Sequence, residues 1–318
     1  MVGQDDAVSA VVRRLRLNKG PLKANFDRPD GVLLFMGPTG VGKTELAKAV
    51  ADAVFGDEKR MVRLDMSEYH DESVGVDKLI GMPRGIVGSP RGGVLTNQLQ
   101  DNPCTVVLLD EIEKASRSVL SVFLQAFDEG WLTDGRGKRI YLSDSIVIMT
   151  SNVGAEQFRA LRSPLGFLAE PVRLEAVRAD VNRELERRFA PEFLNRIDDI
   201  VMFAPLTEDE TRQIAVMHIQ RIADRLGGTG KTLTVSHEAL EQLVREGYSV
   251  AQGARRLKRV IEERIALPLS ERWQDGNAFD VQVVDGRIEV VNVDSLIGPP
   301  DSGINPSANT RGPEPRPS

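Results

Sequence analysis

Several features that define common classes of protein are scarce or missing in this sequence. The 318 residues contain a single cysteine, Cys104, so no internal disulfide framework can form, as is typical of proteins from a reducing cytosol. The longest apolar runs, "GVLLFM" and "SIVIM", are far too short to cross a bilayer. The amino-terminal "MVGQDDAV" lacks the apolar core of a signal peptide. We therefore expect a cytoplasmic protein with no membrane partner.

An excess of basic residues is also missing. The chain carries 41 Lys and Arg against 47 Asp and Glu, a formal net charge of −6. A nucleic-acid-binding surface usually shows as a basic excess, so this balance argues against a nucleic-acid partner. The three histidines and the cysteine have no metal-ligand spacing, and no G-x-S-x-G nucleophile pattern occurs. Proteolysis by the chain itself is therefore not expected.

Short apolar runs alternate with helix-like segments through the first two hundred residues. "GVLLFMG", "CTVVLLDE" and "DSIVIMTSN" are continuous Val/Ile/Leu runs bounded by polar residues, a pattern that predicts strands buried on both faces. Between them, Val119, Phe123 and Phe127 recur at helical spacing before Gly130. The predicted fold class is α/β, a parallel sheet flanked by helices.

The pattern changes near "FAPLTEDE". Thr207 followed by Glu210 is a capping-box pattern, and helical periodicity continues from there to Gly227. Two further helices and the strand-like "FDVQVV" and "RIEVVNV" follow, whereas the last twenty residues hold six of the seventeen prolines and almost nothing apolar. The predicted domains are a large domain over 1–205, a small mainly helical (α+β) lid over 206–297 and a disordered tail over 298–318.

A phosphate-binding motif follows the first apolar run. "GPTGVGKT" matches the P-loop pattern completely, with an apolar strand before it and a helix-forming run after it. The glycines let backbone N–H groups turn around the phosphates of ATP, and the next helix presents its positive amino end. The residues expected to bind the nucleotide are Gly37, Pro38, Thr39, Gly40, Val41, Gly42, Lys43 and Thr44.

Acidic and amide side chains end the two later strands. Asp110 is expected to bind Mg²⁺ together with the Thr44 hydroxyl, and Glu111 is expected to orient an attacking water. The adjacent acids indicate hydrolysis of ATP rather than binding alone. Asn152, at the end of "IVIMTSN", could orient the same water, although asparagine is also frequent in turns.

With these elements in order, the chain resembles an AAA+ ATPase, and more narrowly the second ATPase module of the Clp/Hsp100 protein unfoldases. The strings that carry the resemblance are "VGQDDAV", "GPTGVGKTELAKAVAD", "RLDMSEYHDESV", "LLDEIEKA", "LTDGRGK", "IVIMTSNVG", "PEFLNRID" and "GARRLKRVIEE", which together cover roughly residues 2–290. The resemblance implies that Asn152 is sensor 1 and that Arg196 is an arginine finger for the neighbouring subunit. It also implies that Arg255 is sensor 2, in contact with the nucleotide. From the residues alone, surface ion pairs that contribute little to stability would be the favoured interpretation for both arginines.

The family carries a Gly-aromatic-Val-Gly loop that grips polypeptide in a central pore. Here the loop is Gly85, Ile86, Val87 and Gly88, so isoleucine stands where tyrosine is usual. An aromatic ring offers a broad, rigid contact surface, and isoleucine offers a smaller apolar one. The loop either threads polypeptide with a weaker or differently selective grip, or belongs to a degenerate pore.

A second loop, "RSPLGFLAEP", contains Leu165, Gly166 and Phe167. Clp ATPases that work with a peptidase carry a similar tripeptide, which docks into apolar clefts of a ClpP-type peptidase. The alternative is that both apolar side chains pack on their own domain.

The resemblance implies a homo-oligomeric ring, hexameric by analogy, that hydrolyses ATP with Mg²⁺ and remodels unfolded polypeptide. Family members normally carry further domains before this one, so "MVGQ" at the start would fit either an excised module or a stand-alone single-ring ATPase. Two other functions remain open: an ATP-dependent binding or scaffold protein with a degenerate pore loop, and a nucleic-acid motor. The acidic balance opposes the motor.

Overall fold

The structure is a computed structural model that describes residues 1–21, 23, 25–83, 85, 92–160 and 174–293. These residues form two compact units, each with its own internal contacts. The first unit consists of Met1–Ile214 and Val244–Arg259, and the second begins at Ala215, leaves at Leu243 and resumes at Val260. Because the units interleave along the chain, the boundary expected at residue 206 stays a prediction, and the tail expected over 298–318 lies outside the described residues.

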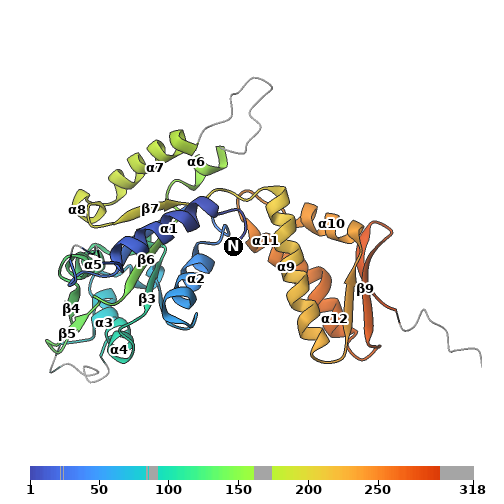
Figure 1. Cartoon of the computed structure of the whole chain (residues 1–318), viewed down its shortest axis with the longest axis horizontal. Coiled ribbons are helices and arrows are strands. Elements are labelled where there is room, and N and C mark those ends of the chain that lie inside the picture. Colours follow the sequence, from blue (N-terminus) through green and yellow to red (C-terminus); the bar gives the residue numbers. More distant parts are fainter. Residues whose placement is uncertain (22, 24, 84, 86–91, 161–173, 294–318) are drawn as a thin grey trace, which may run out of the picture. The chain divides into compact units, whose positions relative to one another are not determined.

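A parallel five-stranded sheet forms the centre of the first unit (Figure 1). Its strand order is β2-β3-β6-β1-β7, and every neighbouring pair is parallel. The carboxyl ends of all five strands therefore meet at one edge of the sheet. The strands are β1 (Gly31–Met36), β2 (Met61–Asp65), β3 (Val106–Asp110), β6 (Ile146–Ser151) and β7 (Asp199–Met202).

The central strands are buried on both faces, as their continuous apolar sequences predict. In β1, Leu34 and Met36 belong to one hydrophobic core, while Leu33 and Phe35 belong to a second core on the other face of the sheet. Alternate side chains of a strand point to opposite faces, so a strand between two cores must be apolar at every position. This explains why the sequence shows runs here and no alternation.

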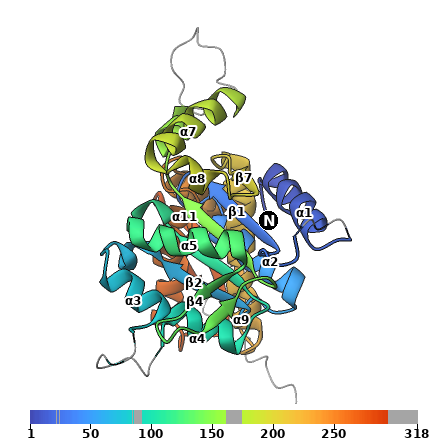
Figure 2. The same cartoon turned by 90° about the vertical axis from the view of Figure 1, so that its left-hand side faces the viewer.

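Helices from different parts of the chain cover the two faces. α5 (Arg117–Glu129) places Phe123 and Phe127 in the first core, and α2 (Lys43–Phe55) and α1 (Asp5–Asn18) pack into the second core. Figure 2 shows α5 and α1 on opposite sides of the strands. Other described helices of this unit are α3 (Val74–Ile80), α4 (Val94–Asp101), α6 (Ala155–Ala160), α7 (Leu174–Arg188) and α8 (Pro191–Leu194), with 3₁₀ turns η1 (Met66–Tyr69) and η3 (Ile112–Lys114). The first six residues of α11 (Ala254–Ile261) also belong to this unit.

Local sequence fixes both ends of α5. The Ser116 side chain accepts a hydrogen bond from the Val119 amide, which caps the amino end. At the other end Gly130 adopts φ +68°, the left-handed conformation that ends a helix readily only at glycine. The predicted helix and its stop are confirmed.

The antiparallel hairpin formed by β4 (Trp131–Thr133) and β5 (Arg139–Tyr141) follows this helix and was not foreseen from the sequence. β2 and β7 were also missed. Both are edge strands of the sheet with partly exposed residues, so neither shows the continuous apolar run of the central strands.

The second unit contains the sheet β10-β9-β8, in which β10 pairs antiparallel and β8 parallel with β9. The expected capping box at the start of α9 is present, because the Thr207 amide donates to the Glu210 carboxylate and the Glu210 amide donates to the Thr207 hydroxyl. The elements in this part of the chain are α9 (Glu208–Gly227), β8 (Thr232–Val235), α10 (His237–Gly247), a π-helical turn η4 (Glu262–Ala266), α12 (Leu267–Glu271), β9 (Ala278–Val284) and β10 (Arg287–Asn292).

The helix expected across "ARRLKRVIEERIA" is interrupted by the π-helical turn η4. The wider turn lies just before Pro268, which has no backbone N–H to continue the helical ladder. Within the described ranges, no helix is both long and apolar enough to span a membrane.

We expect Gly130→Ala to destabilise the first unit more than Gly56→Ala does. Both glycines end a helix with positive φ, so alanine should cost about 1 kcal/mol at either position. At Gly130 a Cβ atom would also lie 1.4 Å from the Asp27 carbonyl oxygen, whereas at Gly56 nothing lies within 4 Å. Urea unfolding should show at least about twice the loss for Gly130→Ala, because backbone must move to admit the methyl group. Equal losses would mean that residues 27 and 130 are not in close contact.

Candidate nucleotide-binding site

The P-loop connects β1 to α2 at the carboxyl edge of the parallel sheet. Its glycines are required by geometry: Gly40 has φ +77°, and a Cβ atom there would lie 2.2 Å from the carbonyl oxygen of Gln252. The Gly40 carbonyl accepts a hydrogen bond of 2.9 Å from the amide of Ala254, the first residue of α11. The start of α11, which also carries Arg255, is therefore fixed against the P-loop within the first unit.

Lys43 is the buried cation of this site, with only 9% of the residue exposed. Its ammonium group donates to the carbonyl oxygens of Gly37 and Pro38, the latter at 3.0 Å, and to the Asn152 side-chain oxygen at 2.9 Å. Burial lowers the pKa of Lys43 from 10.5 to about 8 because desolvation penalises the charged form. The negative charges of Glu113, Asp110 and Glu111 limit that fall, and the charge of Arg255 adds slightly to it.

Asn152 connects Lys43 to Glu111. Its side-chain oxygen accepts from Lys43, while its side-chain nitrogen lies 3.4 Å from a carboxylate oxygen of Glu111. The backbone amide of Asn152 donates to Glu113 at 3.1 Å, which holds the residue at the end of β6. The structure thus brings together three residues that the sequence placed at the ends of separate strands.

The two acids at the end of β3, Asp110 and Glu111, are held by a threonine on the neighbouring strand β6. The Thr150 hydroxyl donates to the Asp110 carboxylate and accepts the Glu111 amide at 3.1 Å. Glu111 adopts φ 58°, ψ 53°, a left-handed conformation that is uncommon for a residue other than glycine. The hydrogen bond that the Glu111 amide donates to Thr150 supports this conformation. As a result, the Glu111 side chain points in a different direction from the one that a continuing strand would give it.

Sequence reasoning missed four residues of this site. Arg63 on β2 forms an ion pair with Asp110 at 2.5 Å, and Lys114 forms one with Glu111. Glu113 and Thr150 complete the set. For three of them the sequence signal was proximity to identified residues: Thr150 lies two positions before Asn152, and Glu113 and Lys114 lie two and three positions after Glu111. Arg63 gave no such signal.

The residues present fit a nucleoside triphosphate and a hard divalent cation. Among the described residues, Lys43 is a buried cation whose hydrogen bonds go only to neutral oxygens, so an anion can still approach it. Thr44, half-buried at the second position of α2, and Asp110 offer the oxygen ligands that Mg²⁺ prefers. No cluster of three or more His, Cys, Asp or Glu side chains that could hold a metal ion by itself occurs in the described part of the chain.

Arg196 follows α8 in the first unit, at a distance along the chain from the P-loop cluster. It forms an ion pair with Asp128, and its guanidinium also donates to the Glu192 carbonyl at 3.1 Å. The structure therefore does not bring Arg196 into contact with Lys43, Asp110 or Glu111 through any bond between described residues.

The two loop predictions mostly cannot be placed. Gly85 has φ +93° with nothing within 4 Å of a Cβ position, but Ile86, Val87 and Gly88 lie outside the described residues. Leu165, Gly166 and Phe167 also lie outside the described residues.

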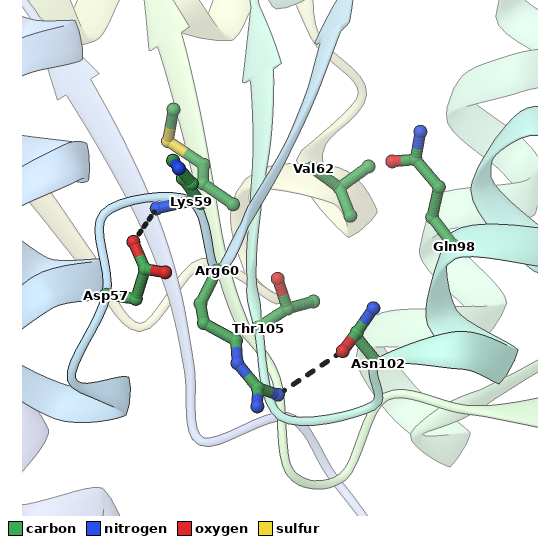
Figure 3. Close-up of a pocket in the computed structure, with 8 residues that line it drawn as sticks. Asp57, Lys59, Arg60, Val62, Gln98, Asn102 and Thr105 are labelled. Carbon is green, nitrogen blue, oxygen red and sulfur yellow. Dashed lines mark hydrogen bonds between the residues drawn. The ribbon is translucent and has the colours of Figure 1, made fainter.

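Two cavities in the described part of the chain have linings that do not include Lys43 itself. One of about 400 Å³ lies at the amino ends of β2 and β3, at the opposite edge of the sheet from the P-loop, where Arg60 donates to Asn102 and the Lys59 amide to Asp57 (Figure 3). The other, of about 450 Å³, lies beside the end of β6. It is lined by Asn152, Val153, Gly154, Ala155, Glu156, Gln157, Glu184 and Arg188.

We expect the pKa of Lys43 to show in the stability of the nucleotide-free protein. Since its pKa is lower in the folded state, the unfolded chain binds more protons between pH 8 and 10.5, and this residue's contribution to the free energy of unfolding rises with pH there. Relative to Lys43→Met, wild type should gain about 2 kcal/mol from pH 8 to pH 10 in urea unfolding. Lys48→Met removes an exposed lysine paired with Glu45 and serves as the control. A stability difference between wild type and Lys43→Met that stays constant with pH would contradict the lowered pKa.

Comparison with known proteins places this chain in a family. Residues 28–200 match the AAA domain (Cdc48 subfamily), and residues 206–285 match the C-terminal D2-small domain of ClpB protein. The chain is 41% identical over 281 residues to the ATP-dependent Clp protease ATP-binding subunit ClpC of Staphylococcus saprophyticus and to that of Staphylococcus epidermidis. Each alignment covers 88% of this chain and 34% of the relative, so the chain spans about a third of the length of these curated relatives.

Solved structures agree with this assignment. Hsp104 in a closed state with ATPγS and FITC-casein superimposes with a TM-score of 0.80 at 40% identity, covering 91% of this chain and 49% of that one. The Hsp104–ADP complex of S. cerevisiae gives a TM-score of 0.80 at 39% identity, covering 92% and 50%. The chain belongs to the AAA ATPase family, and its AAA domain followed by a D2-small domain is the arrangement of a second ATPase module of the Clp/Hsp100 group.

Proposed function

We propose that this chain hydrolyses ATP as one subunit of a ring and uses the energy to remodel polypeptide. The observation that carries the proposal is the link Lys43–Asn152–Glu111, which joins a buried cation to an acid at the carboxyl edge of the sheet. The named relatives support it: ClpC is the ATP-binding subunit of a Clp protease, and Hsp104 was solved with ATPγS and casein.

The roles follow from the chemistry of each side chain. Lys43 and the P-loop amides bind the phosphates, and Asn152 holds Glu111 where it can accept a proton from an attacking water. Thr44 and Asp110 are the residues that would hold Mg²⁺, which when bound neutralises charge on the β- and γ-phosphates. For Asp110 to do so its pair with the exposed Arg63 must open, at a small cost because such pairs are weak.

Arg196 has no contact with the P-loop cluster of its own chain among the described residues, so we propose that it acts on the cluster of a neighbouring copy. A guanidinium supplied in this way stabilises the charge that spreads over the transferred phosphoryl group. This makes hydrolysis depend on assembly and is the reason to propose a ring, hexameric as in the group that the chain resembles. Arg255, beside the P-loop at the start of α11, is proposed to sense the nucleotide.

We also propose that the chain works with a peptidase partner, on the basis of its relatives and of one tripeptide in its sequence. The name of the ClpC relatives makes them subunits of a protease, and Leu165-Gly166-Phe167 matches the kind of tripeptide expected to dock on a ClpP-type peptidase. Loss of peptidase stimulation in a Leu165→Ser variant would support it.

The in-trans role of Arg196 can be tested by mixing two inactive variants. Arg196→Ala and Glu111→Gln should each lower ATP turnover at least about a hundredfold, because each removes one part of a shared site. In a 1:1 mixture, a Glu111→Gln subunit supplies its arginine to the intact site of an Arg196→Ala neighbour. Random assembly with independent sites should then restore about a quarter of wild-type turnover.

The exposed Arg183, which pairs with Asp180 on α7, provides the matched control. Arg183→Ala should turn over ATP at the wild-type rate. Sizing with ATP should show that both inactive variants assemble. Assembly without recovery of turnover would mean that Arg196 does not complete a neighbour's site.

The pore loop can be tested by comparing Ile86, Ile86→Tyr and Ile86→Gly proteins in ATP-driven unfolding of a tagged substrate. If the loop grips polypeptide, tyrosine should speed unfolding several-fold and glycine should slow it, because the apolar contact surface grows or disappears. ATP turnover should change less than about twofold, since residue 86 is not part of the P-loop sequence motif. Equal unfolding by all three would remove the loop from the mechanism, and turnover without any unfolding would favour the scaffold function.

A further inference from the structure

The side chain of Arg196 is held by several contacts in its own chain. One terminal nitrogen pairs with the Asp128 carboxylate, and the other donates to the Glu192 carbonyl at 3.1 Å. Asp128 lies in the last turn of α5, and Glu192 lies in α8. The guanidinium is therefore fixed between two helices that are far apart in the sequence.

A second arginine fastens the backbone on both sides of this pair. Arg28 donates from its Nε to the Phe127 carbonyl at 2.7 Å and from a terminal nitrogen to the Arg196 carbonyl at 3.3 Å. Directly after this turn, Gly130 is packed so closely on the Asp27 carbonyl that no side chain fits. Both residues of the Arg196–Asp128 pair are thus carried on backbone that is itself held in place.

The Nε of Arg196 is buried, and no described residue accepts its hydrogen bond. Leaving a buried donor unpaired costs about 1–3 kcal/mol, so packing for stability alone does not account for this arrangement. A guanidinium has five N–H donors, and each terminal nitrogen keeps a second N–H after its bond to the chain. The Arg196 side chain is 31% exposed, so these donors can still face outward.

We propose that Asp128 is a positioning residue that fixes the direction in which Arg196 presents its free N–H groups to a neighbouring copy. This rests on the proposed in-trans role of Arg196. An arginine on a flexible stem would lose rotamer entropy when it reaches a phosphoryl group. The Asp128 contact already orders the side chain in the free chain, so less entropy is lost when the neighbouring copy binds. The carboxylate also reduces the positive potential of the guanidinium, so the benefit must come from direction rather than from added charge.

A double-mutant cycle in ATP turnover tests the proposal. Asp128→Asn, which keeps the shape and removes the charge, should lower kcat about tenfold and leave the KM for ATP and the melting temperature unchanged. Arg196→Ala should lower kcat further, and adding Asp128→Asn to it should have no additional effect, because Asp128 acts only through Arg196. Glu129→Gln is the control: it removes a charge from the same helix end, where the Glu129 carboxylate accepts a hydrogen bond from Gln125, and should not change kcat.

Mixing extends the test to the neighbouring copy. Asp128→Asn mixed 1:1 with Glu111→Gln should exceed the mean turnover of the two proteins alone, as the mixture with Arg196→Ala does. If Asp128→Asn raises kcat, or lowers it equally in the Arg196→Ala background, the positioning role is wrong. If Arg196→Ala itself keeps full turnover, the proposed in-trans function fails instead. If Asp128→Asn lowers the melting temperature, the same double-mutant cycle is carried out with Asp128→Glu instead. The positioning role then requires that any effect of Asp128→Glu on kcat disappears in the Arg196→Ala background.

Discussion

The buried ammonium of Lys43 is the charge around which the carboxyl edge of the sheet is organised. A cation removed from water is costly unless other groups compensate for it. Here three acids lie near enough to limit the fall of its pKa, yet its hydrogen bonds go to two backbone carbonyls and the amide of Asn152. The folded chain therefore maintains a cation whose best partner is not one of its own carboxylates. In the proposed function a triphosphate provides that partner, so that the stability given up by burying the lysine becomes affinity for an anion.

Strand β6 transmits this constraint across the sheet because it lies between β3 and β1. Thr150 near its end holds the backbone turn that carries Asp110 and Glu111, and Asn152 just beyond its end contacts the P-loop lysine. Thr150 and Asn152, two positions apart, thus connect the acids at the end of β3 to Lys43, which follows β1. A change in the position of Lys43 can reach Glu111 through a single side chain, without movement of the sheet.

The sequence was informative wherever a local rule determines structure. Continuous apolar runs predicted the central strands, Gly130 predicted the end of α5, and the P-loop motif predicted the position of Lys43, because each depends on residues close together in the chain. Arg63 and Asp128 could not be found in this way. Arg63 meets Asp110 47 positions away across a strand pair, and Asp128 on α5 meets Arg196 just after α8, far along the chain. Their charges look like ordinary surface residues until the fold places each beside its partner.

The charged groups of the proposed site divide into two kinds. Asp110, Glu111 and Arg196 each pair with an oppositely charged and partly exposed side chain of the same chain, namely Arg63, Lys114 and Asp128. Exposed pairs contribute only about 0–1 kcal/mol, so Asp110 and Glu111 can exchange partners at small cost when a ligand or a neighbouring copy arrives. Lys43, by contrast, is buried with its position fixed by three hydrogen bonds. The proposed site therefore combines one rigid cation, to which we assign capture of the phosphates, with acids whose contacts can be rearranged. Arg196 differs from those acids because two contacts remain even if its charged partner changes. The hydrogen bond from Arg28 holds its backbone carbonyl, and the Glu192 carbonyl holds one of its terminal nitrogens.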